Sequence, residues 1–446
     1  MRELLLRIRL YWRTRLRFLM VKLQYPPTGP HRAAFRLQPD MLGSIEGCLG
    51  QRLMKIMRSQ IGIVGAGPAG LMLGHLLHLA GVDSVIIENR SEDHVIERVR
   101  AGVLEQPTVD LLIENGVGYR LQRDSLFHDG IHINVLGDRR RIDMAALTGR
   151  RITVYGQNEV VKDLIAARLR SGRPLLFEVA DVSVHDLDSK QPKIQFAKDN
   201  ETHEIRCDFI AGCDGFHGIC RPSIPQNFIR IYERVYPFAW LGILASAPPS
   251  SPELVYSLHH SGFALFSMRS TALTRLYLQC APDEDLAQWP DARIWAELLT
   301  RLESNDGWKP NVGAIIQKGV TGMRSFVTEP MRYGRMFLAG DSAHIVPPTG
   351  AKGLNLAIAD VWRLSRGLGH YYQSGREDLL ERYSDDCLKR VWRAQRFSWW
   401  MTSMLHKSDT DNPFDWRRQL AELEYVTSST AAMTSMAENY VGFPIE

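Results

Sequence analysis

Apolar runs and helical patterns alternate along the chain from residue 57 onward. A run at residues 61–64 enters a turn spelled Gly-x-Gly-x-x-Gly, and apolar residues at helical spacing follow over 71–80. A second apolar run, residues 85–87, ends on Glu88. Short apolar runs bounded by glycine are typical of buried strands, so this order predicts a strand, a tight turn, a helix and a parallel strand.

The rest of the pattern predicts a second sheet and a helical end. No helical period runs through residues 229–281, which favours a separate antiparallel sheet. Its expected strands are residues 240–244, 254–257, 263–267 and 276–279. The other expected elements are a hairpin at 131–143, a helix at 159–170, strands over 175–210, a helix at 292–302, a strand returning to the first sheet at 335–341, and helices from residue 353 to the end.

The glycine turn has the spacing of a dinucleotide-binding loop. Gly65 permits the tight turn, Gly67 lets the backbone approach a pyrophosphate, and Gly70 lets the helix pack on the strand. The free N–H groups at the start of the helix suit phosphate oxygens. Glu88 would accept hydrogen bonds from ribose hydroxyls. These features predict a bound dinucleotide.

Basic residues are concentrated at the front of the chain. Residues 1–56 carry 11 Lys and Arg against 3 Asp and Glu, whereas the whole chain has a net charge of only +4. The body therefore lacks the charge balance of a nucleic-acid-binding protein. The front could form an amphipathic helix on a membrane or a targeting peptide. Pro26-Pro27 and Gly29-Pro30 interrupt its pattern, so we expect a dispensable extension, disordered or arising from a misassigned start before Met57.

Composition indicates a globular protein of a reducing compartment. Apolar residues make up 45% and charged residues 23% of the chain. No apolar run reaches the roughly 20 residues of a membrane span. The six cysteines show no Cys-x-x-Cys pair and no metal-ligand spacing. We therefore expect free thiols, no metal site and a cytoplasmic location.

Three separated stretches together resemble the single-component, class A flavoprotein aromatic hydroxylases. They are the glycine turn with Glu88, Cys213-Asp214-Gly215, and Gly340-Asp341-Ser342-Ala343-His344. Residues 98–106, 154–157, 346–355, 397–402 and 437–442 are also similar to that family. The similarity extends from about residue 57 to the end of the chain. It implies a mixed α/β fold with a Rossmann-like FAD-binding domain, an antiparallel-sheet substrate domain and a helical C-terminal region.

The resemblance divides the chain into five segments. They are the extension 1–56, the first FAD-binding part 57–228, the substrate domain 229–330, the FAD-binding return segment 331–395 and a helical interface region 396–446.

Two stretches suit FAD on chemical grounds. Asp341, at a strand end, offers a carboxylate to a ribityl hydroxyl, and the helix opening at Gly353 can stabilise negative charge at the flavin N1/C2 edge. The resemblance adds Asp214, which serves cofactor placement, and Arg275, which is tied to movement of the flavin. The full predicted set is Gly65, Gly67, Ala69, Gly70, Glu88, Arg98, Val99, Arg100, Ala101, Gly102, Val103, Gln157, Asp214, Arg275, Asp341, Gly353, Leu354 and Asn355.

The resemblance also implies a site for a benzoate. A carboxylate needs a cation and hydroxyls, and Ser267, Arg269 and Tyr277, with Met268 beside them, resemble that clamp. On the phenol side the resemblance implies three further roles: proton removal by Tyr256 and Tyr440, a carbonyl from Pro348, and a proton relay to solvent that ends at His128.

The choice of nicotinamide cofactor stays open between NADPH and NADH. His217, Arg221 and Arg324 match positions associated with nicotinamide binding in the family. Asn89 and His94, however, depart from the arginine and tyrosine usual in the segment linked to that choice. Ala69 also departs from the family, because a serine is common there and the alanine removes one hydroxyl contact to the pyrophosphate.

The activity implied by the resemblance is oxygen insertion into an aromatic acid. A homodimer would convert 4-hydroxybenzoate to 3,4-dihydroxybenzoate with O2 and NADPH or NADH, through a flavin C4a-hydroperoxide. One alternative is a related hydroxylase acting on another hydroxy- or aminobenzoate. A second is a non-catalytic, membrane-docked flavin-binding protein, which the basic front end suggests.

Overall fold

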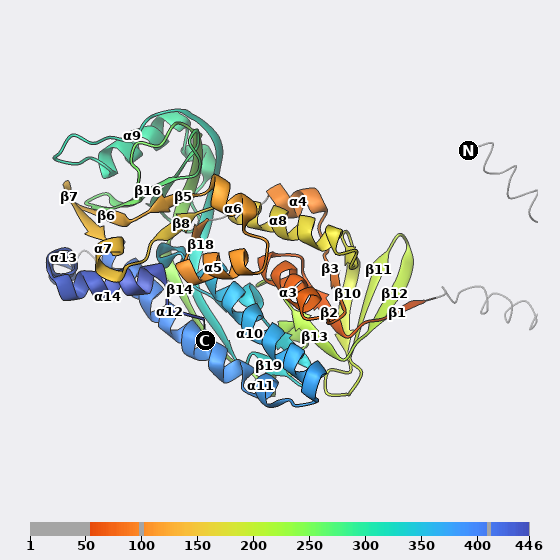
Figure 1. Cartoon of the computed structure of the whole chain (residues 1–446). Helices are drawn as coiled ribbons and strands as arrows, with labels where there is room; N and C mark the ends of the chain where they lie inside the picture. Colours follow the sequence, from red (N-terminus) through yellow and green to blue (C-terminus); the bar gives the residue numbers. More distant parts are fainter. Residues whose placement is uncertain (1–53, 98–101, 408–411, 446) are drawn as a thin grey trace, which may run out of the picture. The chain divides into compact units, whose positions relative to one another are not determined.

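A six-stranded sheet forms around the glycine turn. The computed structural model describes residues 54–97, 102–407 and 412–445, and its ribbon is shown in Figure 1. The strand order is β19-β20-β13-β2-β3-β9, and all neighbours run parallel except the edge pair β19 and β20. The bounds are β2 Ile61–Val64, β3 Ser84–Ile87, β9 Leu175–Leu176, β13 Phe209–Gly212, β19 Arg332–Tyr333 and β20 Met336–Leu338. The predicted βαβ unit and return strand are therefore confirmed.

Helix α3 (Pro68–Leu79) joins β2 to β3 and packs against two other helices, α8 (Gln157–Arg170) and α10 (Gly353–Ser374). Strands β2 and β3 are buried along their whole length, as their unbroken apolar sequences require. Shorter helices complete this part of the chain: α4 Glu92–Glu97, α5 Gln106–Glu114, α6 Tyr119–Asp124 and α7 Met144–Thr148.

An eight-stranded sheet forms the second layer of the fold. Its order is β21-β18-β14-β17-β16-β15-β6-β7, and every pair is antiparallel except β15 with β6. The bounds are β6 Gly130–Val135, β7 Asp138–Asp143, β14 Arg230–Ser246, β15 Val255–His259, β16 Gly262–Met268, β17 Thr274–Cys280, β18 Ala314–Glu329 and β21 His344–Ile345. Helix α9 (Asp291–Arg301) packs on β15 and β16. The predicted second sheet is confirmed.

The hairpin of β6 and β7 pairs with this second sheet, although our division of the chain assigns residues 131–143 to the FAD-binding part. The hairpin itself was predictable, because its turn is local. Its parallel pairing with β15 joins residues more than 120 positions apart in sequence, such as His132 and Val255, and local alternation carries no signal for such a pairing.

Two smaller sheets complete the strands. One has the order β1-β12-β11-β10 and the other β4-β8-β5. Their bounds are β1 Lys55–Arg58, β10 Ala180–His185, β11 Lys193–Lys198, β12 Glu201–Arg206, β4 Val103–Leu104, β5 Leu126–His128 and β8 Ile152–Val154. Strand β1 pairs with β12 from Lys55 onward, so two residues before the predicted start at Met57 belong to this sheet. The extension up to residue 53 lies outside the described residues.

Helices form the end of the chain, as expected. After α10 come α11 Asp378–Glu381, α12 Tyr383–Leu405, α13 Pro413–Ser428 and α14 Thr430–Val441. Helix α13 begins with a proline after Asn412, whose side chain accepts a hydrogen bond from the Phe414 N–H. None of the helices within the described ranges is long and apolar enough to cross a membrane.

Candidate active site

The glycine turn has the geometry that a dinucleotide loop requires. Gly65 has φ +104°, and a Cβ there would lie 2.4 Å from the Cys213 carbonyl oxygen. A Cβ on Gly70 would lie 1.9 Å from the Gly65 oxygen, so α3 reaches the turn only because this residue is glycine. Gly67, the N-cap of α3, has open space beside it. The space beside Gly67 therefore leaves room for a phosphate at the start of α3.

Glu88 lies at the end of β3 and faces the same turn. Its carboxylate accepts hydrogen bonds from the Ala66 N–H at 2.8 Å and the Arg90 N–H at 2.9 Å. These bonds fix the carboxylate beside the glycines, where a ribose would lie. Ala69 is buried in the first turn of α3 and offers no hydroxyl.

A second turn presents Asp341. Gly340, with φ +64°, donates its N–H to Asp360 Oδ2 at 2.9 Å, and His344 Nε2 lies 2.7 Å from the same oxygen. The side chains of His344 and Asp360 are both buried. Burial alone would favour a neutral ring, but the Asp360 carboxylate outweighs it and raises the pKa of His344. This buried pair fixes the turn that carries Asp341.

The start of α10 also suits an anionic edge. No described side chain caps this helix, and Gly353 has open space beside it. Its first N–H groups can therefore bind a ligand atom with partial negative charge. Leu354 follows in the first turn. Asn355 accepts the Glu105 N–H at 3.0 Å and donates to the Val103 carbonyl at 3.2 Å, so the β4 segment is tied to this helix.

Lys352, the N-cap of α10, is a buried cation. Its ammonium donates to Glu105 Oε1 at 2.6 Å, to the Asn439 carbonyl and to the Tyr440 carbonyl at 3.3 Å. Arg390 lies 3.1 Å from the other oxygen of Glu105. Burial lowers the pKa of Lys352, although Glu105 opposes that shift. Sequence reasoning missed this cluster, because its members lie up to 335 positions apart.

Two of the predicted cofactor residues carry buried polar atoms that lack hydrogen-bond partners among the described residues. They are Asp214 Oδ1, and Nε and Nη1 of Arg275. The other oxygen of Asp214 accepts the Cys220 N–H at 2.8 Å, and burial raises the pKa of this carboxyl group. The Arg275 guanidinium lies 5.1 Å from the centre of the Tyr277 ring. Unpaired buried donors and acceptors of this kind fit a bound polar cofactor or ligand.

The sheet register brings the predicted substrate residues onto one face. Tyr256, Leu265 and Tyr277 are direct neighbours across β15, β16 and β17, and Ser267 is the neighbour of Arg275 two pairs further along. Alternate residues of a strand share a face, so Tyr256, Ser267, Arg275 and Tyr277 point to the same side. Met268 ends β16 and points to the other side.

Arg269 follows β16 and lies beside Gly102, Gly156 and Asn158. Its Nη2 donates to Asn158 Oδ1 at 2.6 Å, and a Cβ on Gly156 or Gly102 would lie 2.4 and 2.7 Å from its guanidinium. These two glycines therefore leave the room that Arg269 occupies. Burial lowers the pKa of Arg269. Gln157, between Gly156 and Asn158, is the first residue of α8.

Tyr256 and Tyr440 are joined through their hydroxyl groups. The two oxygens form a short hydrogen bond, and the Tyr256 hydroxyl donates to the Thr349 carbonyl at 3.1 Å. Both side chains are buried, and burial raises the pKa of each. The prediction named the carbonyl of Pro348, which opens the short 3-10 helix η5 (Pro348–Gly350), whereas the structure adds Thr349 next to it.

His128 does not lie at the surface, contrary to its expected place at the solvent end of a relay. It ends β5, its exposed fraction is 0%, and neither ring nitrogen has a hydrogen-bond partner among the described residues. Burial lowers the pKa of His128 to about 4. The short segment around it gave no periodic signal from which this burial could be read.

The three predicted nicotinamide residues meet around a single ring, Phe216. The guanidinium groups of Arg221 and Arg324 lie 4.7 and 4.6 Å from its centre, and the His217 ring lies 5.0 Å away. Arg221 also donates to the carbonyls of Phe216, at 2.6 Å, and Ser342, at 3.0 Å. Sequence reasoning did not single out Phe216.

Part of the predicted FAD set cannot be located. Arg98, Val99, Arg100 and Ala101 lie outside the described residues, and Gly102 and Val103 follow directly. Asn89 and His94 are exposed on the other side of that gap, before and within α4. No group of three or more potential metal ligands occurs among the residues described.

Known proteins resemble both the sequence and the fold. Residues 58–398 match the family model described as FAD binding domain. The chain is 50% identical, over 394 residues, to a p-hydroxybenzoate hydroxylase of Acinetobacter baylyi, which covers 88% of this chain and 97% of the relative. A 3-(3-hydroxy-phenyl)propionate/3-hydroxycinnamic acid hydroxylase of Mycolicibacterium smegmatis is 25% identical and covers 74% of this chain and 58% of its own length.

A comparison with solved structures finds the same fold. The crystal structure of p-nitrophenol 4-monooxygenase from Pseudomonas putida superposes with a TM-score of 0.73 at 19% identity, over 87% of this chain and 99% of that one. The open glycine turn, the uncapped start of α10 and the unpaired atoms of Asp214 and Arg275 fit FAD. This chain belongs to the FAD-binding domain family of flavoprotein aromatic hydroxylases.

Proposed function

We propose that this protein hydroxylates 4-hydroxybenzoate to 3,4-dihydroxybenzoate, using O2 and NADPH or NADH. The observation that carries the proposal is the buried pair of hydroxyls on Tyr256 and Tyr440, on the sheet face that also bears Ser267, Arg275 and Tyr277. The likeness to a p-hydroxybenzoate hydroxylase over 97% of that protein's length supports the same substrate.

The residues divide between the two ends of the substrate. Arg269 binds the carboxylate, together with Ser267 and Tyr277, because a buried guanidinium is the strongest partner for a buried carboxylate. Tyr256 accepts the phenol proton and passes it to Tyr440. A phenolate directs electron density to the carbon beside it, which a neutral phenol does poorly. Bound FAD, reduced by the nicotinamide cofactor, supplies the activated oxygen.

The enclosure of the site matters as much as its polar groups. Tyr256 and Tyr440 are 1% and 2% exposed, so their surroundings hold little water. Excluding water favours oxygen transfer to the ring over loss of the oxidant. Because the Tyr256 hydroxyl donates its hydrogen to the Thr349 carbonyl, its oxygen is free to accept a hydrogen bond from Tyr440. His128 would receive the proton beyond Tyr440 only through intervening water, because its ring is buried and has no described partner.

One assay tests the proposal. Purified holoenzyme is given O2, NADPH or NADH, and a panel of 3-hydroxy-, 4-hydroxy- and 4-aminobenzoate. We expect 4-hydroxybenzoate alone to give stoichiometric oxidation of the nicotinamide with 3,4-dihydroxybenzoate as product. Preference for another benzoate would instead support the related-hydroxylase alternative, and no substrate-dependent oxidation would support a non-catalytic flavin protein.

We further propose nicotinamide binding at the Phe216 cluster and a cytoplasmic homodimer. The gathering of His217, Arg221 and Arg324 around one ring supports the first. The buried free cysteines among the described residues are consistent with a reducing compartment. Light scattering on purified protein tests the dimer, and Arg324→Ala tests the cluster through the KM for NADPH and NADH.

A further inference from the structure

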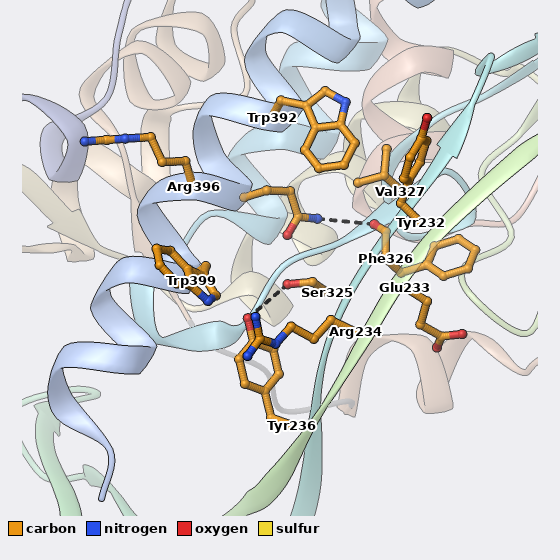
Figure 2. Close-up of a pocket in the computed structure, with 11 residues that line it drawn as sticks. Tyr232, Glu233, Arg234, Tyr236, Ser325, Phe326, Val327, Trp392, Arg396 and Trp399 are labelled. Atoms are coloured by element: carbon orange, nitrogen blue, oxygen red, sulfur yellow. Dashed lines mark hydrogen bonds between the residues drawn. The ribbon is translucent and has the colours of Figure 1, made fainter. Parts of the chain in front are cut away.

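A cavity lies between the first half of β14 and helix α12, away from the paired tyrosines. Its volume is about 380 Å³, and its walls include Tyr232, Arg234, Tyr236, Phe326, Gln395 and Trp399 (Figure 2). Tyr236 lies six residues before Gly242, which pairs with Tyr277 across β14 and β17. Six residues of strand span roughly 20 Å, so the cavity is separate from the substrate clamp.

Aromatic side chains line this cavity on two sides, and at one end the Tyr232 ring packs edge-on against the Trp392 ring, with 5.4 Å between their centres. Trp392 and Trp399 lie two turns apart on one side of α12, and Tyr232 and Tyr236 approach from β14 (Figure 2). The tryptophan side chains are 41% and 43% exposed, which is high for residues of this size. An aromatic lining of this kind suits a planar aromatic ligand.

Two polar groups define what that ligand must carry. The guanidinium of Arg234 lies 5.5 Å from the centre of the Tyr236 ring, whereas Arg396 points away from the strands in Figure 2. Gln395 is 5% exposed, and its Nε2 donates to the carbonyls of Phe326 and Ile345, but its Oε1 has no partner among the described residues. The cavity therefore offers one cation at its mouth and one buried acceptor.

We propose that this cavity is a second binding site, for a hydroxylated aromatic carboxylate. The phenolic O–H donates to Gln395 Oε1, the ring packs beside Trp399 and Tyr236, and the carboxylate pairs with Arg234. This choice of ligand rests on the proposed function, because 4-hydroxybenzoate and its dihydroxy product are then the aromatic acids that the enzyme meets.

A ligand bound in this cavity would affect two neighbouring parts of the molecule. Phe326 packs edge-on against Phe216, at 5.0 Å, and Glu233 pairs with Arg324, so the cavity shares walls with the proposed nicotinamide cluster. Gln395 binds Ile345, which lies between Asp341 and Pro348 in the chain. The bound acid would thus alter the KM for the nicotinamide cofactor.

Equilibrium dialysis of the holoenzyme, without nicotinamide, counts the sites. We expect two molecules of 4-hydroxybenzoate or 3,4-dihydroxybenzoate per chain in the wild type. Arg269→Ala should remove one, and Arg234→Ala or Trp399→Ala should weaken the other about tenfold or more. These two changes are at exposed positions, so folding is not at risk. Arg376→Ala, an exposed arginine outside the cavity with the same charge change, is the control.

Any other outcome would contradict one part of the proposal: the second site, the clamp or the class of ligand. A single site that Arg269→Ala abolishes would overturn the second site and leave the proposed function intact. A single site that only Arg234→Ala weakens would support the cavity and count against the clamp. Tighter binding of adenosine monophosphate than of either acid, relieved by Arg234→Ala, would overturn the class of ligand. A change of oligomeric state in Trp399→Ala, with no second site, would assign this surface to another copy of the chain.

Discussion

Replacing Tyr256 by phenylalanine removes one buried oxygen and two hydrogen bonds. The Tyr440 hydroxyl loses its short bond, and the Thr349 carbonyl loses a donor at 3.1 Å. Leaving such buried groups unpaired costs about 1–3 kcal/mol, so we expect the free energy of unfolding to fall by that amount. The fold should persist, because the ring still packs against Phe263 and Tyr440.

The chemical effect should be larger than the effect on stability. Positioned proton transfer contributes about 10²–10⁴-fold, so the ring should be hydroxylated that much more slowly while substrate binding and flavin reduction continue. The electrons taken from the nicotinamide cofactor would then appear in hydrogen peroxide instead of supporting hydroxylation. The measurement is the ratio of 3,4-dihydroxybenzoate formed to nicotinamide oxidised, with peroxide determined in parallel.

Two variants make this test selective. Tyr440→Phe should show a milder loss of coupling, because Tyr440 is one step further along the relay. Tyr277→Phe, a matched change in the clamp, should weaken binding and leave the ratio near that of the wild type. Full coupling in Tyr256→Phe, with the loss confined to binding, would refute proton removal by the pair and reduce both tyrosines to packing residues.

Three further predictions follow from the geometry. Arg269→Ala should weaken 4-hydroxybenzoate binding by about 2–5 kcal/mol, since a desolvated carboxylate loses its partner, and titration of the flavin absorbance measures this. Gly102→Ala should displace Arg269, because the new Cβ would lie 2.7 Å from its Nη1; the same titration should show weaker binding, and unchanged affinity would place the guanidinium elsewhere. Burial lowers the pKa of His406 to about 3, below its unfolded value of about 6.5. The unfolded state therefore binds more protons between these pH values. The free energy of unfolding should decrease as the pH is lowered from 6.5 to 3, by up to about 1.4 kcal/mol per pH unit. In His406→Gln, chemical denaturation should show a flatter pH dependence over that range.

The parts that sequence predicts well are those whose cause is local. The glycine turn is one: Gly65 needs a positive φ and Gly70 a close backbone contact, and both demands appear as glycines within a short stretch. The strands of the second sheet are another, since alternation is visible within each strand. Once these strands are ordered, register follows, and it brings Tyr256, Ser267 and Tyr277 onto one face.

The parts that sequence misses depend on packing between distant segments. Glu105 binds Lys352 and Arg390, and no local pattern marks Glu105 or Lys352 as buried. Phe216 gathers three predicted nicotinamide residues, although an isolated phenylalanine is usually read as core. His128 was matched through resemblance alone, which gives a position but not its solvent exposure. In each case the missing information is a tertiary contact.

Helix α10 joins these separate parts. Its N-cap, Lys352, binds the carbonyls of Asn439 and Tyr440 as well as Glu105, its Asn355 binds the β4 segment, and its Asp360 binds Gly340. The segment before Tyr440, the turn of Asp341 and the strand after the proposed FAD arginines are therefore all tied to one rigid element. Because buried ionic contacts are costly to break singly, a shift of this helix would move the proposed cofactor contacts and the proposed proton relay together. On this proposal, the alignment of the phenol with the flavin depends on α10 as much as on the residues that contact either molecule.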